Sequence, residues 1–266
     1  MNTPTYDQIR RNVREHYEGV VTQSQLTSSC CQTKVSYDPV KDVAHVSAQL
    51  GYSKDELQSV PSGANLGLGC GNPQAIASLQ PGENVLDLGS GAGFDCFLAA
   101  RQVGENGRVI GVDMTPAMVS AARTHAENSG NTIVDFRLGE IEHLPVADET
   151  IDVIISNCVI NLSPDKKQVF QEAYRVLRSG GRLAISDIVT TAELPFAIKN
   201  DTQDLYSGCI SGASSIEELT TMMKQSGFTN ILIQPKEDSK EFLKEWLPNT
   251  PIEDYIVSAV IQAVKA

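Results

Sequence analysis

The chain has 266 residues, of which 41% are hydrophobic and 20% charged, a composition typical of globular proteins. Its formal net charge of −12 argues against a general nucleic-acid or anionic-membrane partner, because neither favours an acidic surface. No apolar run approaches the ~20 residues of a membrane span, and the six cysteines follow no secretory signal. We therefore expect a cytoplasmic, monomeric protein with reduced thiols and with no nucleic-acid or membrane partner.

The first part of the chain, residues 1–80, lacks the repeating pattern of the remainder and is expected to form a helical and loop cap. Apolar residues at helical spacing predict a short amphipathic helix over residues 5–19. The polar segment 22–34 indicates a loop, and so does the glycine-rich segment 65–73.

A glycine turn opens the core, which we expect over residues 81–187. The apolar run 84–88 predicts a buried strand, and Gly89 and Gly91 follow it directly, before residues with helical periodicity. The N–H groups and the helix dipole of such a turn favour an anionic or carboxylate-bearing ligand. A pyridine-dinucleotide fingerprint would place its third glycine or alanine at Phe94. The G-x-G-x-G spacing instead resembles the first motif of S-adenosylmethionine-dependent methyltransferases, and this resemblance implies S-adenosylmethionine as the cofactor in place of NAD(H).

Two acids follow the next strands of the core. The strand predicted at 108–113 ends on Asp113, which is placed to accept hydrogen bonds from both ribose hydroxyls of the cofactor. After the third strand, Glu140 could accept from the adenine amino group and the N–H of Ile141 could meet a ring nitrogen, although Glu140 could instead be a solvated loop acid. The candidate cofactor-binding residues are Asp87, Gly89, Ser90, Gly91, Asp113, Met114, Glu140, Ile141 and Asn157.

Strands and helices continue to alternate along the chain, which predicts an α/β, Rossmann-like fold. The resemblance of the glycine motif implies that this fold is of the S-adenosylmethionine-dependent methyltransferase type. We expect a seven-stranded, mainly parallel sheet with an antiparallel edge strand. Residues 188–214 have no clear period and are expected to form a substrate-binding insert, before the end of the sheet and a short C-terminal segment at 215–266. The further strands are expected at 132–138, 151–156, 182–187, 228–234 and 254–264.

Cysteines provide the most informative candidates for chemistry. Cys96 lies beside a packed phenylalanine and fits a small buried hydrophobe, but Cys70, Cys158 and Cys209 have no packing period around them. All three are expected at the cofactor side of the sheet, where thiolates suit soft ions and metalloids. A zinc site is the competing interpretation, but the sequence has no Cys-x₂-Cys pair and no histidine at ligand spacing.

Five segments of the chain resemble the arsenite S-adenosylmethyltransferase family. They are Gly69–Pro73, Gly139–Pro145, Ser156–Leu162, Gln171–Leu177 and Gly208–Ala213. The resemblance implies methylation of arsenite and methylarsenite in arsenic detoxification, with the trivalent arsenic held by Cys70, Cys158 and Cys209. It also implies a thiol relay, here Cys30 or Cys31, and a thiol reductant of the thioredoxin or glutathione type.

The chain departs from animal and algal members of that family in two respects. They carry Tyr where this chain has Leu68, so a ring contact to the cofactor is missing there. The chain also ends soon after its last expected strand, and we expect the additional C-terminal domain of longer members to be absent or reduced to residues 236–266.

An arsenic atom held by sulfurs keeps its lone pair, which can attack the methyl group of S-adenosylmethionine in line with the departing sulfur. No proton leaves this nucleophile, so no general base is expected. A methyltransferase of a quinone or another small organic acceptor is one alternative, but it would need a base or an apolar pocket and has no use for three cysteines. A thiol-based metalloid-binding protein without turnover is the other.

Overall fold

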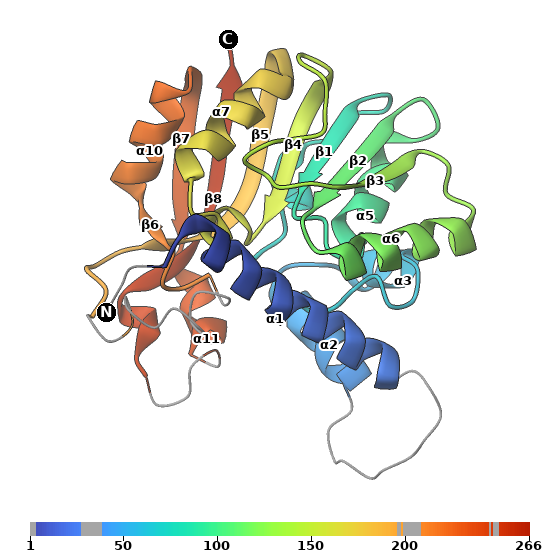
Figure 1. Ribbon diagram of the computed structural model, residues 1–266, viewed down its shortest axis with the longest axis horizontal. Coiled ribbons are helices and arrows are strands. Elements are labelled where there is room, and N and C mark those ends of the chain that lie inside the picture. The colour runs from blue at the N-terminus through green and yellow to red at the C-terminus, as the bar shows by residue number, and fades with distance from the viewer. Residues whose placement is uncertain (1–3, 28–38, 196–197, 199–208, 245, 247–249) are drawn as a thin grey trace.

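The computed structural model describes residues 4–27, 39–195, 198, 209–244, 246 and 250–266. These residues form a sheet with strand order β3-β2-β1-β4-β5-β8-β7, and the two-residue strand β6 pairs with β5 off this path (Figure 1). The strands are β1 Asn84–Leu88, β2 Arg108–Asp113, β3 Val134–Leu138, β4 Ile151–Asn157, β5 Leu177–Thr190, β6 Ser214–Ser215, β7 Phe228–Lys236 and β8 Ile256–Lys265.

Strand β8 runs antiparallel to both of its neighbours, β5 and β7, whereas the pairs formed by β1 to β6 are parallel. The predicted α/β fold class is therefore confirmed. The sheet has eight strands with β6, and the antiparallel strand lies one position inside the edge, with β7 outside it.

Helices cover both faces of the sheet. In β1, the side chain of Val85 packs with α5 and α6 on one face, while Leu86 and Leu88 belong to the cluster that includes α7 and α10 on the other. This alternation follows from the two-residue period of a strand. The helices are α1 Tyr6–Thr27, α2 Pro39–Gln49, α3 Lys54–Ser59, α4 Gln74–Ala77, α5 Phe94–Val103, α6 Pro116–Ser129, α7 Lys166–Val176, α10 Ile216–Gln225 and α11 Lys240–Leu243, with 3₁₀ turns at Ile160–Leu162, Glu237–Ser239 and Ile252–Asp254.

The first helix is longer than the sequence predicted. The expected helix at 5–19 continues to Thr27, so the loop predicted over residues 22–34 is wrong for its first six residues. The apolar stripe explains the extension, because Val13 and Val21 are both buried and lie on the same face of α1. Figure 1 shows α1 crossing below the sheet, on the side where the parallel strands end.

The boundary of the predicted insert at 188–214 also differs from the elements observed. Strand β5 continues to Thr190 because Ile188 and Val189 are fully buried and pair with Ser258 and Val257 of β8. At the other end of the segment, Ser214 already pairs with β5 as part of β6. Among the described residues, no helix is long and apolar enough to cross a membrane.

Candidate active site

A cavity of ≈ 340 Å³ lies where β1, β2 and β4 end. Its volume falls within the range of small-molecule sites. Four segments supply most of the wall: α1, the segment 64–69, the glycine turn and the residues that follow β4. The ends of parallel strands therefore open into a space that α1 covers, which is the usual place for a ligand in open α/β sheets.

The backbone of the glycine turn has no room for a larger residue at Gly89. Gly89 has a φ of +70°, and a Cβ atom there would collide with the side chain of Val159. The N–H of Gly91 donates to Asp113 at 3.0 Å, which joins the turn to the end of β2. The hydroxyl of Ser90 is buried, lines the cavity and has no hydrogen-bond partner in the described part of the chain. The turn is thus narrow, preorganised and able to accept a further polar contact.

The carboxylate of Asp113 is held by two backbone groups. One oxygen accepts from the N–H of Thr115 at 2.8 Å, and the other accepts from Gly91. The hydroxyl of Thr115 also donates to this carboxylate, which has about four lone-pair positions and so keeps one for a ligand hydroxyl. Burial raises the pKa of Asp113, although these three hydrogen bonds act in the opposite direction. Asp113 lines the cavity, as the sequence analysis requires of a ribose-binding acid.

A second acidic group lies deeper, beside the glycine turn. Asp87 and Asp95 are both buried and both line the cavity. Burial raises the pKa of Asp95 to about 6, although hydrogen bonds that include one from Tyr52 at 2.8 Å lower it. Burial also raises the pKa of Asp87 well above its ordinary value, and Cys96 donates to this carboxylate at 3.3 Å. A cationic group bound here would gain from both carboxylates.

Asn157, at the end of β4, connects this acidic group to the cysteine-bearing loop. Its amide oxygen accepts from the N–H of Cys70 at 3.0 Å, and its amide nitrogen donates to the carbonyl of Gly71 at 2.8 Å and to the hydroxyl of Tyr52 at 3.1 Å. Asn157 also lines the cavity. One side chain therefore fixes the position of the loop 69–71 relative to the cofactor region.

Glu140 has a different environment from the other cofactor candidates. Met114 and Ile141 line the cavity, but Glu140 lies in a neighbouring hollow between α1 and the end of β3. Its carboxylate is 3.3 Å from the guanidinium of Arg10 and 3.8 Å from that of Arg14, both on α1. In this structure Glu140 therefore holds α1 against the sheet.

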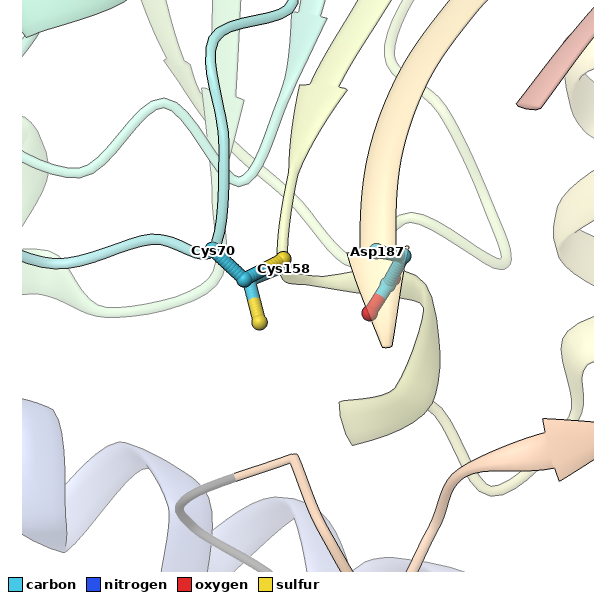
Figure 2. A group of neighbouring side chains, drawn as sticks. All are labelled: Cys70, Cys158 and Asp187. Atoms are coloured by element: carbon cyan, nitrogen blue, oxygen red, sulfur yellow. The ribbon is translucent and has the colours of Figure 1, made fainter. Parts of the chain in front are cut away.

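The three cysteines singled out from the sequence belong to one cluster of buried side chains, from which Cys158 and Cys209 line the cavity. Cys70 precedes α4, Cys158 directly follows β4, and Cys209 comes from the segment after β5. All three are free and buried. Figure 2 shows Cys70 and Cys158 with Asp187, whose carboxylate oxygen and the two Sγ atoms all lie within 4.8 Å of one another.

Both thiols that line the cavity sit on unusual backbone. Cys158 has a φ of 58° and Cys209 a φ of 65°, in the left-handed region that non-glycine residues rarely occupy. At Cys158 this conformation turns the chain away from β4 while its N–H still donates to Ser186 at 2.8 Å. Such strain is found mainly at functional sites.

The surroundings of Cys158 and Cys209 favour the protonated thiol, because the pKa of each is raised. Hydrogen bonds with the thiols of Cys209 and Cys70, followed by burial, raise the pKa of Cys158 well above its ordinary value. A hydrogen bond with Cys158 lowers the pKa of Cys209, but burial together with the charges of Asp187 and Cys70 outweighs this bond, and the pKa is raised. A neutral thiol can replace a hydroxyl group on an uncharged compound whose central atom carries hydroxyl groups. Each replacement forms one bond between that atom and sulfur, and the thiol proton leaves with the hydroxyl group as water.

The remaining cysteines are separate from this group. Cys96 is fully buried and hydrogen-bonded to Asp87 on the opposite side of the glycine turn, so the core role expected for it is consistent with its place. Cys30 and Cys31 lie outside the described residues.

Three residues of the site were not anticipated from the sequence: Tyr17, Asp95 and Asp187. Asp95 could have been found, because an acid in the first turn of the helix that follows a glycine loop must face the cofactor region. The sequence shows Tyr17 only as a member of the apolar stripe on α1, and it gives no sign that this residue belongs to the site. Its side chain packs against both the cluster that contains Cys158 and the cluster that contains Ala92 of the glycine turn.

Known proteins with similar sequences agree with this geometry. Residues 79–227 match the family described as a methyltransferase domain. The arsenite methyltransferase of Halobacterium salinarum is 50% identical over 97% of this chain and 67% of that protein. The arsenite methyltransferases of Mus musculus and Aquipseudomonas alcaligenes are 36% and 38% identical, each over 84% of this chain. The chain spans only 58% and 62% of their lengths.

Solved structures place the fold in the same group. The crystal structure of an arsenic(III) S-adenosylmethionine methyltransferase from Chlamydomonas reinhardtii superposes with a TM-score of 0.63 and 33% identity, over 83% of this chain and 73% of that one. A phosphoethanolamine N-methyltransferase from Haemonchus contortus, with bound S-adenosylhomocysteine, has a TM-score of 0.62 at 20% identity, over 74% of this chain and 53% of that one, and supports the fold alone. Since the match to the archaeal protein extends over nearly the whole chain, the chain belongs to the arsenite methyltransferase family of S-adenosylmethionine-dependent enzymes.

Proposed function

We propose that this chain transfers methyl groups from S-adenosylmethionine to trivalent arsenic, in arsenite and in methylarsenite, held by Cys70, Cys158 and Cys209. One observation carries the proposal: three buried thiols from three separate segments meet at the end of the cavity whose other end is the glycine turn. A methyltransferase of an organic acceptor has no use for such a cluster.

The residues at the glycine turn fit the proposed cofactor. Gly89 leaves space that a Cβ atom would fill, the Ser90 hydroxyl has no partner in the described part of the chain, and the carboxylate of Asp113 lines the cavity. Asp113 binds the ribose hydroxyls, and Asp87 with Asp95 faces the cationic amino group. When bound, S-adenosylmethionine supplies an electrophilic methyl group on a sulfonium.

Arsenic loading uses the thiols as they stand in the structure. Arsenite exchanges its hydroxyls for Cys158 and Cys209, which line the cavity, and then for Cys70, which contacts Cys158. Each exchange forms an As–S bond, breaks an As–O bond and releases water. The arsenic then bears a lone pair facing the cofactor region, and the enzyme needs only to position it.

Cys30 or Cys31 relays thiol–disulfide exchange with this site in the proposal, and a thioredoxin- or glutathione-type reductant restores the thiols. The resemblance to the arsenite methyltransferases supports this part of the proposal. We further propose that the chain works as a monomer in the cytoplasm.

The direct test is incubation of the reduced protein with S-adenosylmethionine, arsenite and excess thiol, followed by chromatography with elemental detection of arsenic. We expect the wild-type protein to produce methylated arsenic and the Cys158→Ser variant to produce none. Bound but unmethylated arsenic would indicate a metalloid-binding protein. Methylation of quinones or similar acceptors, with none of arsenic, would indicate the other alternative.

A further inference from the structure

The cluster in Figure 2 contains one donor that trivalent arsenic does not require. Besides the Sγ atoms of Cys70 and Cys158, it includes a carboxylate oxygen of Asp187, and all three residues are buried. Trivalent arsenic makes three bonds, and the three cysteines can supply them. The carboxylate at the end of β5 is therefore an additional ligand in the same small volume.

The carboxylate of Asp187 is held in place by its neighbours. Its Oδ1 atom accepts from the side chain of Asn161 at 2.9 Å and from the N–H of Ile188 at 2.8 Å. Its Oδ2 atom accepts from the N–H of Ile160 at 2.9 Å, and the backbone N–H of Asn161 also donates to this carboxylate. These bonds fix the carboxylate rigidly, and ligating carboxylates are commonly hydrogen-bonded in this way.

The chemistry of this donor set differs from that of an arsenic site. Zn²⁺ takes four ligands in a tetrahedron, and thiolate sulfur and carboxylate oxygen are both among its usual ligands. Two thiols with a carboxylate provide three such ligands. The thiol of Cys209 neighbours that of Cys158 and is the candidate for the fourth ligand, although its Sγ atom lies outside the group of atoms that are all within 4.8 Å of one another. The sequence has no Cys-x₂-Cys pair, but the fold assembles a comparable set from the segment before α4 and the ends of β4 and β5.

We propose that Cys70, Cys158 and Asp187, completed by Cys209, bind a thiophilic divalent cation of the Zn²⁺ or Cd²⁺ type. The cation replaces the proton of each thiol that it binds, and these protons are released to the solvent. Because the cation and arsenic need the same sulfurs, binding is mutually exclusive. A bound cation prevents arsenic from loading without touching the glycine turn or Asp113. The proposal concerns metal binding by the protein alone, so it stands or falls independently of methyl transfer.

The test is a titration of the reduced full-length chain with Cd²⁺ alone, read from its thiolate-to-metal charge-transfer absorption against a competing chelator. We expect one tight Cd²⁺ per chain, with affinity at least tenfold lower in Cys158→Ser and in Asp187→Asn. Arsenite bound first should abolish the signal. Cys96→Ala, which removes a buried thiol outside the cluster, should leave the titration unchanged.

Asp187→Asn distinguishes a ligand from a structural support. If Asp187 is a ligand, the variant loses Cd²⁺ affinity but binds arsenite within threefold of the wild-type protein, measured by equilibrium dialysis. A parallel loss of both affinities, or unchanged Cd²⁺ affinity, would overturn the proposal. Should the variant fail to fold, X-ray absorption of the wild-type Cd²⁺ complex decides. A shell of three sulfurs and one oxygen supports the assignment, and a shell of sulfur alone, with a cysteine such as Cys30 as fourth ligand, refutes it.

Discussion

The Sγ atom of Cys209 donates a hydrogen bond to the main-chain carbonyl oxygen of Cys158 at 2.8 Å. The two thiols that line the cavity are therefore attached to each other through the backbone, although 51 residues separate them in the sequence. Cys70 is attached elsewhere, because its N–H donates to Asn157 and its carbonyl accepts from Ser258 at 2.7 Å. The cluster therefore consists of a hydrogen-bonded pair, Cys158 and Cys209, and a third thiol, Cys70, whose backbone is held by other residues.

This division predicts different effects of serine substitutions. Cys158→Ser and Cys209→Ser should abolish methylation of both arsenite and methylarsenite, because a hydroxyl is a poor partner for soft arsenic. Cys70→Ser should lose arsenite methylation yet keep much of the activity on methylarsenite, which already has one bond occupied and needs two thiols. Arsenic speciation under excess thiol reductant measures both activities. Equal loss on both substrates in Cys70→Ser would remove the distinction between the pair and the third thiol.

The placement of Asp113 predicts weaker cofactor binding in Asp113→Ala. The substitution removes both acceptors for the ribose, and one hydrogen bond to a charged group contributes roughly 1.5–3 kcal/mol. The dissociation constant of S-adenosylmethionine should therefore rise by at least about tenfold. Asp135→Ala, on the neighbouring strand and paired with Arg137 on the surface, is the control. Calorimetry that finds unchanged affinity in Asp113→Ala would contradict the placement.

The buried carboxyl of Asp95 predicts a dependence of stability on pH. Its pKa is raised from 3.8 to about 6 by burial, so between these values the folded protein holds a proton that the unfolded chain has lost. The protonated group therefore contributes about 3 kcal/mol to the free energy of unfolding. This contribution is fully present below pH 4 and is lost as the pH rises through 6. Urea unfolding of the wild type and Asp95→Asn from pH 4 to 7 measures it. The free energies of unfolding should diverge across this window, and parallel curves would show that the group titrates normally.

The relay thiol can be identified by peptide mapping of the oxidised protein. Cys30 and Cys31 are adjacent, with Cα atoms ~3.8 Å apart, which is shorter than the usual range for a disulfide. We expect one of them to be joined to Cys70 rather than to its neighbour. A predominant link between Cys30 and Cys31 would exclude a relay of this kind.

Much of the cofactor half of the site could be predicted from the sequence. The strands ending at Leu88 and Asp113 were predicted with the bounds observed, because a strand buried on both faces is a short apolar run and the glycines mark its end. The sequence also placed Cys70, Cys158 and Cys209 on the cofactor side of the sheet, and the resemblance to the arsenite methyltransferases implied that they hold one arsenic atom. The strand ends and the glycine turn are features local in the chain.

Asp187 could not be predicted in this way. It follows Ser186 in β5, a strand that also carries Arg178 and Arg182, and nothing nearby in the sequence distinguishes it from a solvent-facing position. Its closeness to Cys158 results from the pairing of β4 with β5, where Asn157 is opposite Ser186. The ion pairs of Glu140 with Arg10 and Arg14 were missed for the same reason, because they depend on how α1 crosses the sheet. Such relationships are properties of the tertiary arrangement.

The left-handed backbone at Cys158 and Cys209 has a consequence for how this protein would respond to selection. Each residue holds a conformation that glycine or asparagine adopts more easily, and such strain costs of order 1–3 kcal/mol. Replacing Cys158 by glycine relieves that strain and also removes a bond to arsenic. A selection for heat resistance would therefore enrich substitutions of these two cysteines, and the resulting variants would be inactive. At both positions, greater stability is gained at the expense of arsenic binding.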